Sequence, residues 1–137
     1  MAEADPLTPY SRALGIVVDR MEGEVPVLRV EFADAVQGRP GALHGGAISG
    51  LLETAGYAVL RGALVKSGRP SAMKPINLTV QFLASGKPRP TFARARIVKL
   101  GRRTANLSIE AWQDDSAHPI ASAVMNVMVA TGEQAAG

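Results

Sequence analysis

The chain has 137 residues, of which 47% are hydrophobic and 20% charged, the length and composition of one globular domain with a sizeable core. The absence of cysteine excludes a disulfide scaffold and a thiolate zinc site, and the two histidines, His44 and His118, are too far apart in sequence to suggest another metal site. The net charge of +3 comes from scattered basic residues, which together with an aromatic content of 4% argues against nucleic-acid binding.

The first 12 residues are expected to form a loose or partly helical arm. The opening sequence MAEADPLTPYSRALG lacks the apolar core of a secretory signal peptide. The longest stretch near the predicted helix without Asp, Glu, Lys or Arg covers residues 40–52, which is too short to span a membrane. We therefore expect a cytoplasmic protein without a membrane segment, built as a single domain over residues 1–137.

Two apolar runs, residues 16–21 and 25–32, lie on either side of Glu22-Gly23-Glu24. A glycine within a short polar connection between two such runs predicts a β-hairpin. Pro40 and Gly41 then interrupt the chain before a long helix that ends near Lys66.

The predicted helix is apolar or small on nearly all sides. Apolar side chains recur at helical spacing along one side: Ile48, Leu51, Leu52, Ala55 and Val59. The other side carries small residues, one aromatic residue and one acid: Ser49, Gly50, Glu53, Gly56 and Tyr57. A helix of this kind is buried on most sides. We expect a sheet to cover part of the helix and a second subunit to cover the rest.

Apolar and polar residues alternate from Ile76 to Phe82, which predicts a half-buried strand. Three further strands are predicted over residues 91–100, 104–113 and 119–131, with short turns between them. Consecutive strands of this type form an antiparallel sheet, and one helix is available to cover its apolar face. The order predicts an α+β domain in which an antiparallel sheet of five to six strands is wrapped around one long central helix.

His44-Gly45-Gly46 opens the predicted helix, and the acid Glu53 follows nine positions after the histidine. Together with the strand sequence INLTVQFLASGKP and the turn Gly101-Arg102-Arg103, these residues resemble the hotdog-fold thioesterases of the 4-hydroxybenzoyl-CoA and phenylacetate-pathway type. The resemblance extends over roughly residues 15–131. It implies the hotdog fold, hydrolysis of an acyl- or aryl-CoA thioester without a metal or organic cofactor, and assembly into a dimer or tetramer.

The resemblance also implies roles for the residues at the start of the helix. The backbone N–H of Gly45 is the oxyanion donor, because N–H groups at a helix N-terminus lack partners and lie at the positive end of the helix dipole. Gly46 supports the turn. Glu53 either activates water as a general base or attacks the thioester as a nucleophile. His44 orients the loop and the thioester, with general acid catalysis as the alternative role.

Seven residues are expected to contact the substrate: Gln37, Tyr57, Phe82, Lys87, Arg89, Arg102 and Arg103. Tyr57, one helical turn after Glu53, would form a wall of the pocket. The four basic residues would bind the phosphates of CoA, and the three arginines suit phosphate through the forked donors of the guanidinium group; the alternative is that they are simply solvated. Family members often have Asn or Gln six residues before the histidine, where this chain has Gly38, so Gln37 would need a one-residue shift of the loop to replace it.

Gly45 and Glu53 are eight residues apart, which is about 12 Å along a helix axis. A thioester carbonyl must lie within about 3–3.5 Å of its attacking group, so one chain supplies both groups only with difficulty. We predict a two-fold dimer with antiparallel helices and shared sites, in which Gly50 and Gly56 allow the helices to approach. The alternative to an enzyme is a non-catalytic acyl-CoA-binding hotdog protein. A hydratase of the same fold, which would need an Asp–His pair at its site, is the less favoured enzyme.

Overall fold

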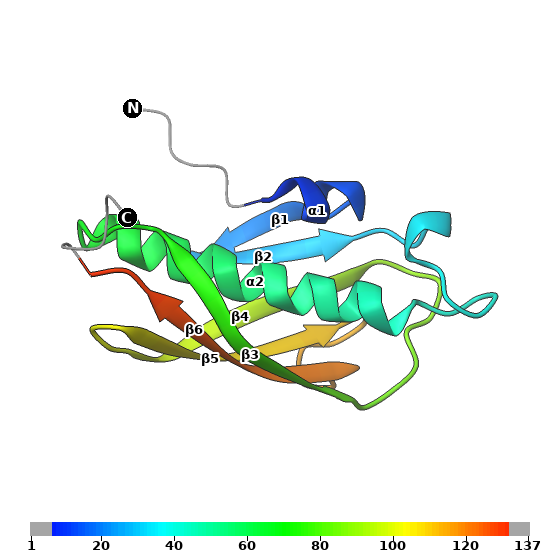
Figure 1. The fold of residues 1–137 in the computed structure, drawn as a ribbon. Helices are drawn as coiled ribbons and strands as arrows, with labels where there is room; N and C mark the ends of the chain where they lie inside the picture. Colours follow the sequence, from blue (N-terminus) through cyan, green and yellow to red (C-terminus); the bar gives the residue numbers. More distant parts are fainter. Residues whose placement is uncertain (1–6, 132–137) are drawn as a thin grey trace.

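The computed structural model describes residues 7–131 (Figure 1). The helices are α1 (Pro9–Ala13), the 3-10 helix η1 (Asp34–Val36) and α2 (Gly45–Lys66). The strands are β1 (Val17–Glu22), β2 (Val25–Val30), β3 (Met73–Phe82), β4 (Thr91–Leu100), β5 (Thr104–Trp112) and β6 (Ala121–Val129). The six strands form one antiparallel sheet that curves around α2, which confirms the predicted α+β hotdog architecture.

The first strands form the predicted hairpin, in which Gly23 turns with a φ of 63°, a conformation that favours glycine. The strand after α2 begins at Met73, three residues earlier than the alternation from Ile76 predicts. A β-bulge between Pro75 and Asn77 accommodates the proline, which has no N–H for the ladder.

The sheet order is β1-β2-β4-β5-β6-β3, so β3 pairs with β6 rather than with β4, the next strand in the chain. Residues 83–90 carry the chain from this edge of the sheet back to its centre, where β4 pairs with β2 and β5. As a result, β3 is an edge strand. Its end and the loop that follows it lie near the start of α2 (Figure 1).

The core lies between α2 and the inner face of the sheet. Fully buried leucines of α2 pack against apolar side chains of the strands: Leu51, Leu52, Leu60 and Leu64 from the helix, with Leu28, Leu107 and Met125 from the sheet. Burial of each such side chain stabilises the fold by about 1.5–3 kcal/mol. The helix is therefore held in place along its length, and its first turn has a fixed position relative to β3.

The prediction that Gly50 and Gly56 of α2 allow a second helix to approach is wrong, because both are covered within the same chain. A β-carbon at Gly50 would lie 2.9 Å from Cδ1 of Leu14, next to the ring of Tyr10, because α1 packs there. A β-carbon at Gly56 would lie 2.8 Å from Sδ of Met125, on the sheet. The close approach that the glycines permit is therefore made by elements of the same chain.

The N-terminal arm is helical from Pro9 to Ala13, with Thr8 as the N-cap, and residues 1–6 lie outside the described part of the chain. None of the helices within residues 7–131 is long and apolar enough to cross a membrane.

Candidate active site

The first turn of α2 is organised by His44, its N-cap. The Nδ1 atom of His44 accepts a hydrogen bond from the N–H of Gly46 at 2.8 Å, and its backbone carbonyl accepts from Ala47 and Ile48 at 3.0 and 3.1 Å. Within residues 7–131, the N–H of Gly45 has no hydrogen-bond partner. The positive end of the helix dipole lies at the same place. An oxygen that carries negative charge can therefore bind at Gly45.

The space beside Gly45 is bounded by the end of β3. A β-carbon at Gly45 would lie 3.4 Å from Cζ of Phe82, whose side chain is 55% exposed. The N–H of Leu43 donates to the carbonyl of Gly86 at 3.0 Å, so the loop after β3 is held against the loop before α2. The predicted residues Gly45 and Phe82 are thus neighbours, and Lys87 follows directly after this contact.

Glu53 lies two turns further along α2 and is half-buried. In the part of the chain that the structure describes, it has neither a hydrogen bond nor an ion pair, and Lys66 pairs instead with Glu24. Burial, and secondly the charge of Glu53, raise the pKa of Tyr57, which shows that the carboxylate and the phenol share one side of the helix. The carboxylate is therefore free to accept a proton or to attack a substrate.

The loop before α2 uses the side chain of Gln37 for its own structure. Its Oε1 atom accepts a hydrogen bond from the N–H of Gly41 at 2.9 Å. Gly38 packs against the histidine, since a β-carbon there would lie 3.1 Å from Cα of His44. The amide oxygen of Gln37 thus closes the loop, and a role for Gln37 in substrate binding stays a prediction.

The structure separates the basic residues that were predicted to bind phosphate. Lys87 and Arg89 lie in the loop at the start of α2, where Arg89 forms an ion pair with Asp114 at 2.8 Å. Arg102 and Arg103 lie on the β4–β5 turn at the other end of the helix (Figure 1). The position of this turn is fixed by Arg69, which follows α2 and donates to the carbonyls of residues 101 and 102. Because α2 has 22 residues and is about 33 Å long, the two groups do not meet in one chain.

Tyr10 of α1 packs beside α2, a position that was not predicted from the sequence. Its hydroxyl would lie 3.4 Å from a β-carbon at Gly50, which is between Gly45 and Glu53 along α2. The local signal was present, because Thr8 followed by Pro9 is a typical helix start with an N-cap and a proline at the first position. The same described residues contain no group of three or more His, Asp or Glu placed to hold a metal ion.

The model of the Thioesterase superfamily matches residues 40–120, more than half of the chain, and the protein therefore belongs to this family. The medium/long-chain acyl-CoA thioesterase YigI of Escherichia coli K12 is 28% identical over 133 residues, which cover 88% of this chain and 85% of YigI. The family match and this relative confirm the resemblance on which the fold was predicted.

Two solved structures are examples of proteins with the same fold. Thioesterase HI1161 of Haemophilus influenzae has a TM-score of 0.79 at 18% identity, over 89% of this chain and 82% of that chain. The PaaI protein of the E. coli phenylacetic acid degradation operon has a TM-score of 0.76 at 20% identity, over 91% and 86% of the two chains.

Proposed function

We propose that the protein hydrolyses acyl-CoA thioesters to the free acid and CoA, with the N–H of Gly45 as the oxyanion donor. The observation that carries this proposal is the unpaired N–H of Gly45 at the start of α2, beside Phe82. A thioester oxygen that accepts from this N–H becomes more negative as the carbonyl is attacked, and the helix dipole favours that charge. Donors of this kind contribute about 10²–10³ in kcat in other enzymes.

His44 acts as a positioning residue for this donor. Because its Nδ1 accepts the N–H of Gly46, a neutral imidazole carries its proton on Nε2. The cap holds the first turn of α2 in place and leaves the N–H of Gly45 directed away from the helix. Loss of the cap would allow the first turn to fray and the donor to move.

Glu53 supplies the attack on the thioester carbon. As a general base, it takes a proton from water while the hydroxide adds to the carbon and the C–S bond breaks. As a nucleophile, its oxygen forms an anhydride, the thiolate leaves, and water then hydrolyses the anhydride. In both routes the thiolate of CoA takes up a proton. The absence of an ion-pair partner for Glu53 within residues 7–131 supports either role.

Two chains share each site. Gly45 and Glu53 are separated by about 12 Å along α2, too far for one thioester to reach both easily. The strand β3 has β6 on one edge and, within the described residues, no strand on the other. Large apolar side chains on and after β3 are about half exposed: Ile76, Phe82 and Leu83. Because an open apolar edge favours pairing, a two-fold dimer along β3 is the assembly that the chain supports best.

The substrate is a medium- or long-chain acyl-CoA. The name of YigI describes such substrates. The exposed ring of Phe82 beside Gly45 offers an apolar surface to the acyl chain of the substrate. Lys87 is exposed, close to the start of α2, where it meets the phosphates of CoA.

A thiol-release assay with acyl-CoAs of increasing chain length, and with an aryl-CoA, tests the proposal. We expect CoA release at a rate proportional to enzyme, with higher kcat/KM for medium and long chains than for acetyl-CoA. Saturable binding of these thioesters without release of thiol from any of them would contradict hydrolysis and identify a non-catalytic acyl-CoA-binding protein.

A further inference from the structure

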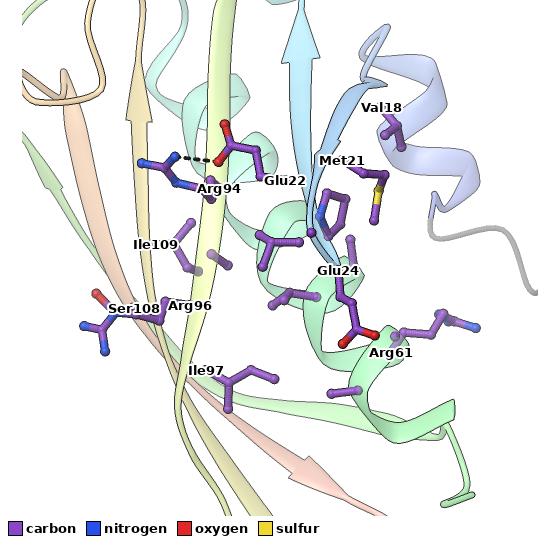
Figure 2. A pocket seen from close by; sticks show the side chains of 18 of the residues that line it. Val18, Met21, Glu22, Glu24, Arg61, Arg94, Arg96, Ile97, Ser108 and Ile109 are labelled. Carbon is purple, nitrogen blue, oxygen red and sulfur yellow. Dashed lines mark hydrogen bonds and ion pairs between the residues drawn. The ribbon is translucent and has the colours of Figure 1, made fainter. Parts of the chain in front are cut away.

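A cavity of about 1170 Å³ lies between the β1–β2 hairpin, β4 and the second half of α2 (Figure 2). It exists because the sheet opens there. Strand β2 pairs with β4 only over Leu28–Val30, opposite Thr91–Ala93, whereas residues 25–27 of β2 pair only with β1. Pro26 lies in the part of β2 that does not pair with β4, and it has no N–H to donate. The opening therefore follows from the strand pairing.

The inner wall of this cavity, which we call the β2–β4 cavity, is apolar. Val59 of α2 and Ile109 of β5 are buried, and Ile97 of β4 also lines the cavity; Ile97 and Ile109 are labelled in Figure 2. Gly62 of α2 also lines it, and a β-carbon there would meet no atom within 4 Å. The volume exceeds the range of about 300–1000 Å³ that is usual for small-molecule sites. The space suits a long, flexible apolar chain better than a compact ligand.

The charged residues at the rim leave positive charge uncompensated. Glu22 pairs with Arg94 at 2.8 Å, as the dashed line in Figure 2 shows, and Arg94 also pairs with Glu110 at 2.8 Å. The remaining acid of the rim, Glu24, pairs with Lys66. Hydrogen bonds from Arg94 and then Arg20 lower the pKa of Glu22, so this acid stays charged and paired.

The two remaining charged residues at the rim are arginines. Arg61 of α2 and Arg96 of β4 line the cavity and have no hydrogen bond or ion pair within residues 7–131. The lining holds four cations and three acids, so every acid is paired and one positive charge remains in excess. This charge pattern favours an anion over a cation or a neutral ligand.

We propose that the β2–β4 cavity binds a fatty carboxylate of medium or long chain, with its chain against Val59, Ile97 and Ile109 and its carboxylate at Arg61. Arg61 is half-buried on the same helix as Gly62, whereas Arg96 is exposed on the far side of β4. The α2 residues that line the cavity all lie between Ala58 and Lys66, and neither Gly45 nor Glu53 contributes to it. It is therefore a site separate from the proposed thioester site, and binding in it needs no turnover.

Calorimetric titration of the whole protein with dodecanoate tests this proposal, with Gly62→Leu to fill the cavity and Gly62→Ala as the matched control. We expect saturable binding to the wild type, a loss of affinity of about tenfold or more in Gly62→Leu, and little change in Gly62→Ala. Both variants should melt at a higher temperature than the wild type, since glycine is unfavourable inside a helix. If Gly62→Leu melts at a higher temperature than the wild type, its loss of dodecanoate binding does not result from misfolding. Arg61→Gln should weaken dodecanoate binding more than Arg96→Gln.

The alternative ligand of the β2–β4 cavity is the acyl chain of a bound acyl-CoA thioester, instead of a free fatty carboxylate. A thioether analogue of dodecanoyl-CoA, which is not hydrolysed, distinguishes the two. We expect Gly62→Leu to leave its affinity unchanged, and equal losses for the analogue and dodecanoate would overturn the assignment to a free carboxylate. Absence of saturable dodecanoate binding to the wild type, or equal affinity in Gly62→Leu, would overturn the site itself. Thiol release by Gly62→Leu from a short acyl-CoA, measured in parallel, reports on the proposed hydrolysis independently.

Discussion

The Nδ1 atom of His44 accepts the backbone N–H of Gly46 at 2.8 Å, and this bond decides which N–H of the first turn stays free. The carbonyl of His44 takes the N–H groups of Ala47 and Ile48. Among the described residues, Gly45 is then the one member of the first four N–H groups of α2 without a partner. His44 therefore caps α2 and leaves the N–H of Gly45 as the group that can bind an anion.

Replacing His44 distinguishes its role as the N-cap of α2 from a direct role of its imidazole in the reaction. His44→Ala should lower the free energy of unfolding by about 1 kcal/mol, as for other lost N-caps, and should reduce kcat because the first turn frays. His44→Asn should recover both, since the Asn oxygen can accept the same N–H. Urea unfolding and thiol release measure the two effects. A stable His44→Asn protein with low turnover would show that the imidazole itself takes part in the reaction.

Glu53→Gln should fold normally and lower kcat by at least about 10², the range for loss of a general base. It should also lower the pKa of Tyr57, because it removes the neighbouring negative charge, but not to the ordinary value, since burial is the larger cause. The pKa is measured by ultraviolet titration in a Tyr10→Phe background, where Tyr57 is the remaining tyrosine of the chain. Wild-type turnover in this variant, with the expected fall in the pKa of Tyr57, would remove Glu53 from the mechanism.

The predictable features were those encoded locally. Gly23 between two apolar runs indicated the hairpin, alternation after Pro75 indicated β3, and the spacing of His44 and Glu53 indicated the family. All three depend on residues close in sequence, and the structure and family comparison confirm the elements and the family.

Features that depend on distant neighbours were not predictable. Gly56 is visibly small, but only the fold shows that Met125 of the sheet fills the space beside it. Likewise, Arg102 has the right chemistry for phosphate, yet the strand order places it at the opposite end of α2 from Gly45. Pairing of β3 with β6 joins residues from 39 (Phe82 with Ala121) to 56 (Met73 with Val129) positions apart, and no short pattern encodes that choice.

The positions of the basic residues predict how CoA is held. Lys87→Ala should raise KM for acyl-CoA, because the loop that carries Lys87 lies beside Gly45. The double replacement of Arg102 and Arg103 by Ala should raise KM as well, through the turn of the second chain in an antiparallel dimer. Neither change should affect thioesters of a truncated thiol that lacks the phosphates. Equal losses on both kinds of substrate would assign these residues to folding or assembly.

A shared site predicts complementation between two inactive variants. In a heterodimer of Glu53→Gln and Gly45→Pro chains, one site collects both defects and the other site is intact. Unfolding and refolding the two variants together should therefore restore thiol release, whereas each variant refolded alone stays inactive. Mass spectrometry verifies that heterodimers form. If heterodimers are present and the mixture remains inactive, both groups act within one chain.

The proposal that the free N–H of Gly45 polarises the thioester is tested by Gly45→Pro. Proline removes this N–H without breaking a hydrogen bond within the described residues, and proline is favoured at the first position of a helix. The extended backbone of His44, with ψ of 134°, is the conformation that a residue before proline adopts.

The matched control is Gly45→Ala, whose β-carbon at 3.4 Å from Phe82 makes an ordinary contact and which keeps the N–H. The decisive measurement is kcat for an acyl-CoA in the two variants, both shown to be folded by circular dichroism and thermal unfolding. If this N–H polarises the thioester, kcat of Gly45→Pro is lower than that of Gly45→Ala by a factor of about 10²–10³. Turnover by a folded Gly45→Pro protein at the rate of Gly45→Ala would contradict it.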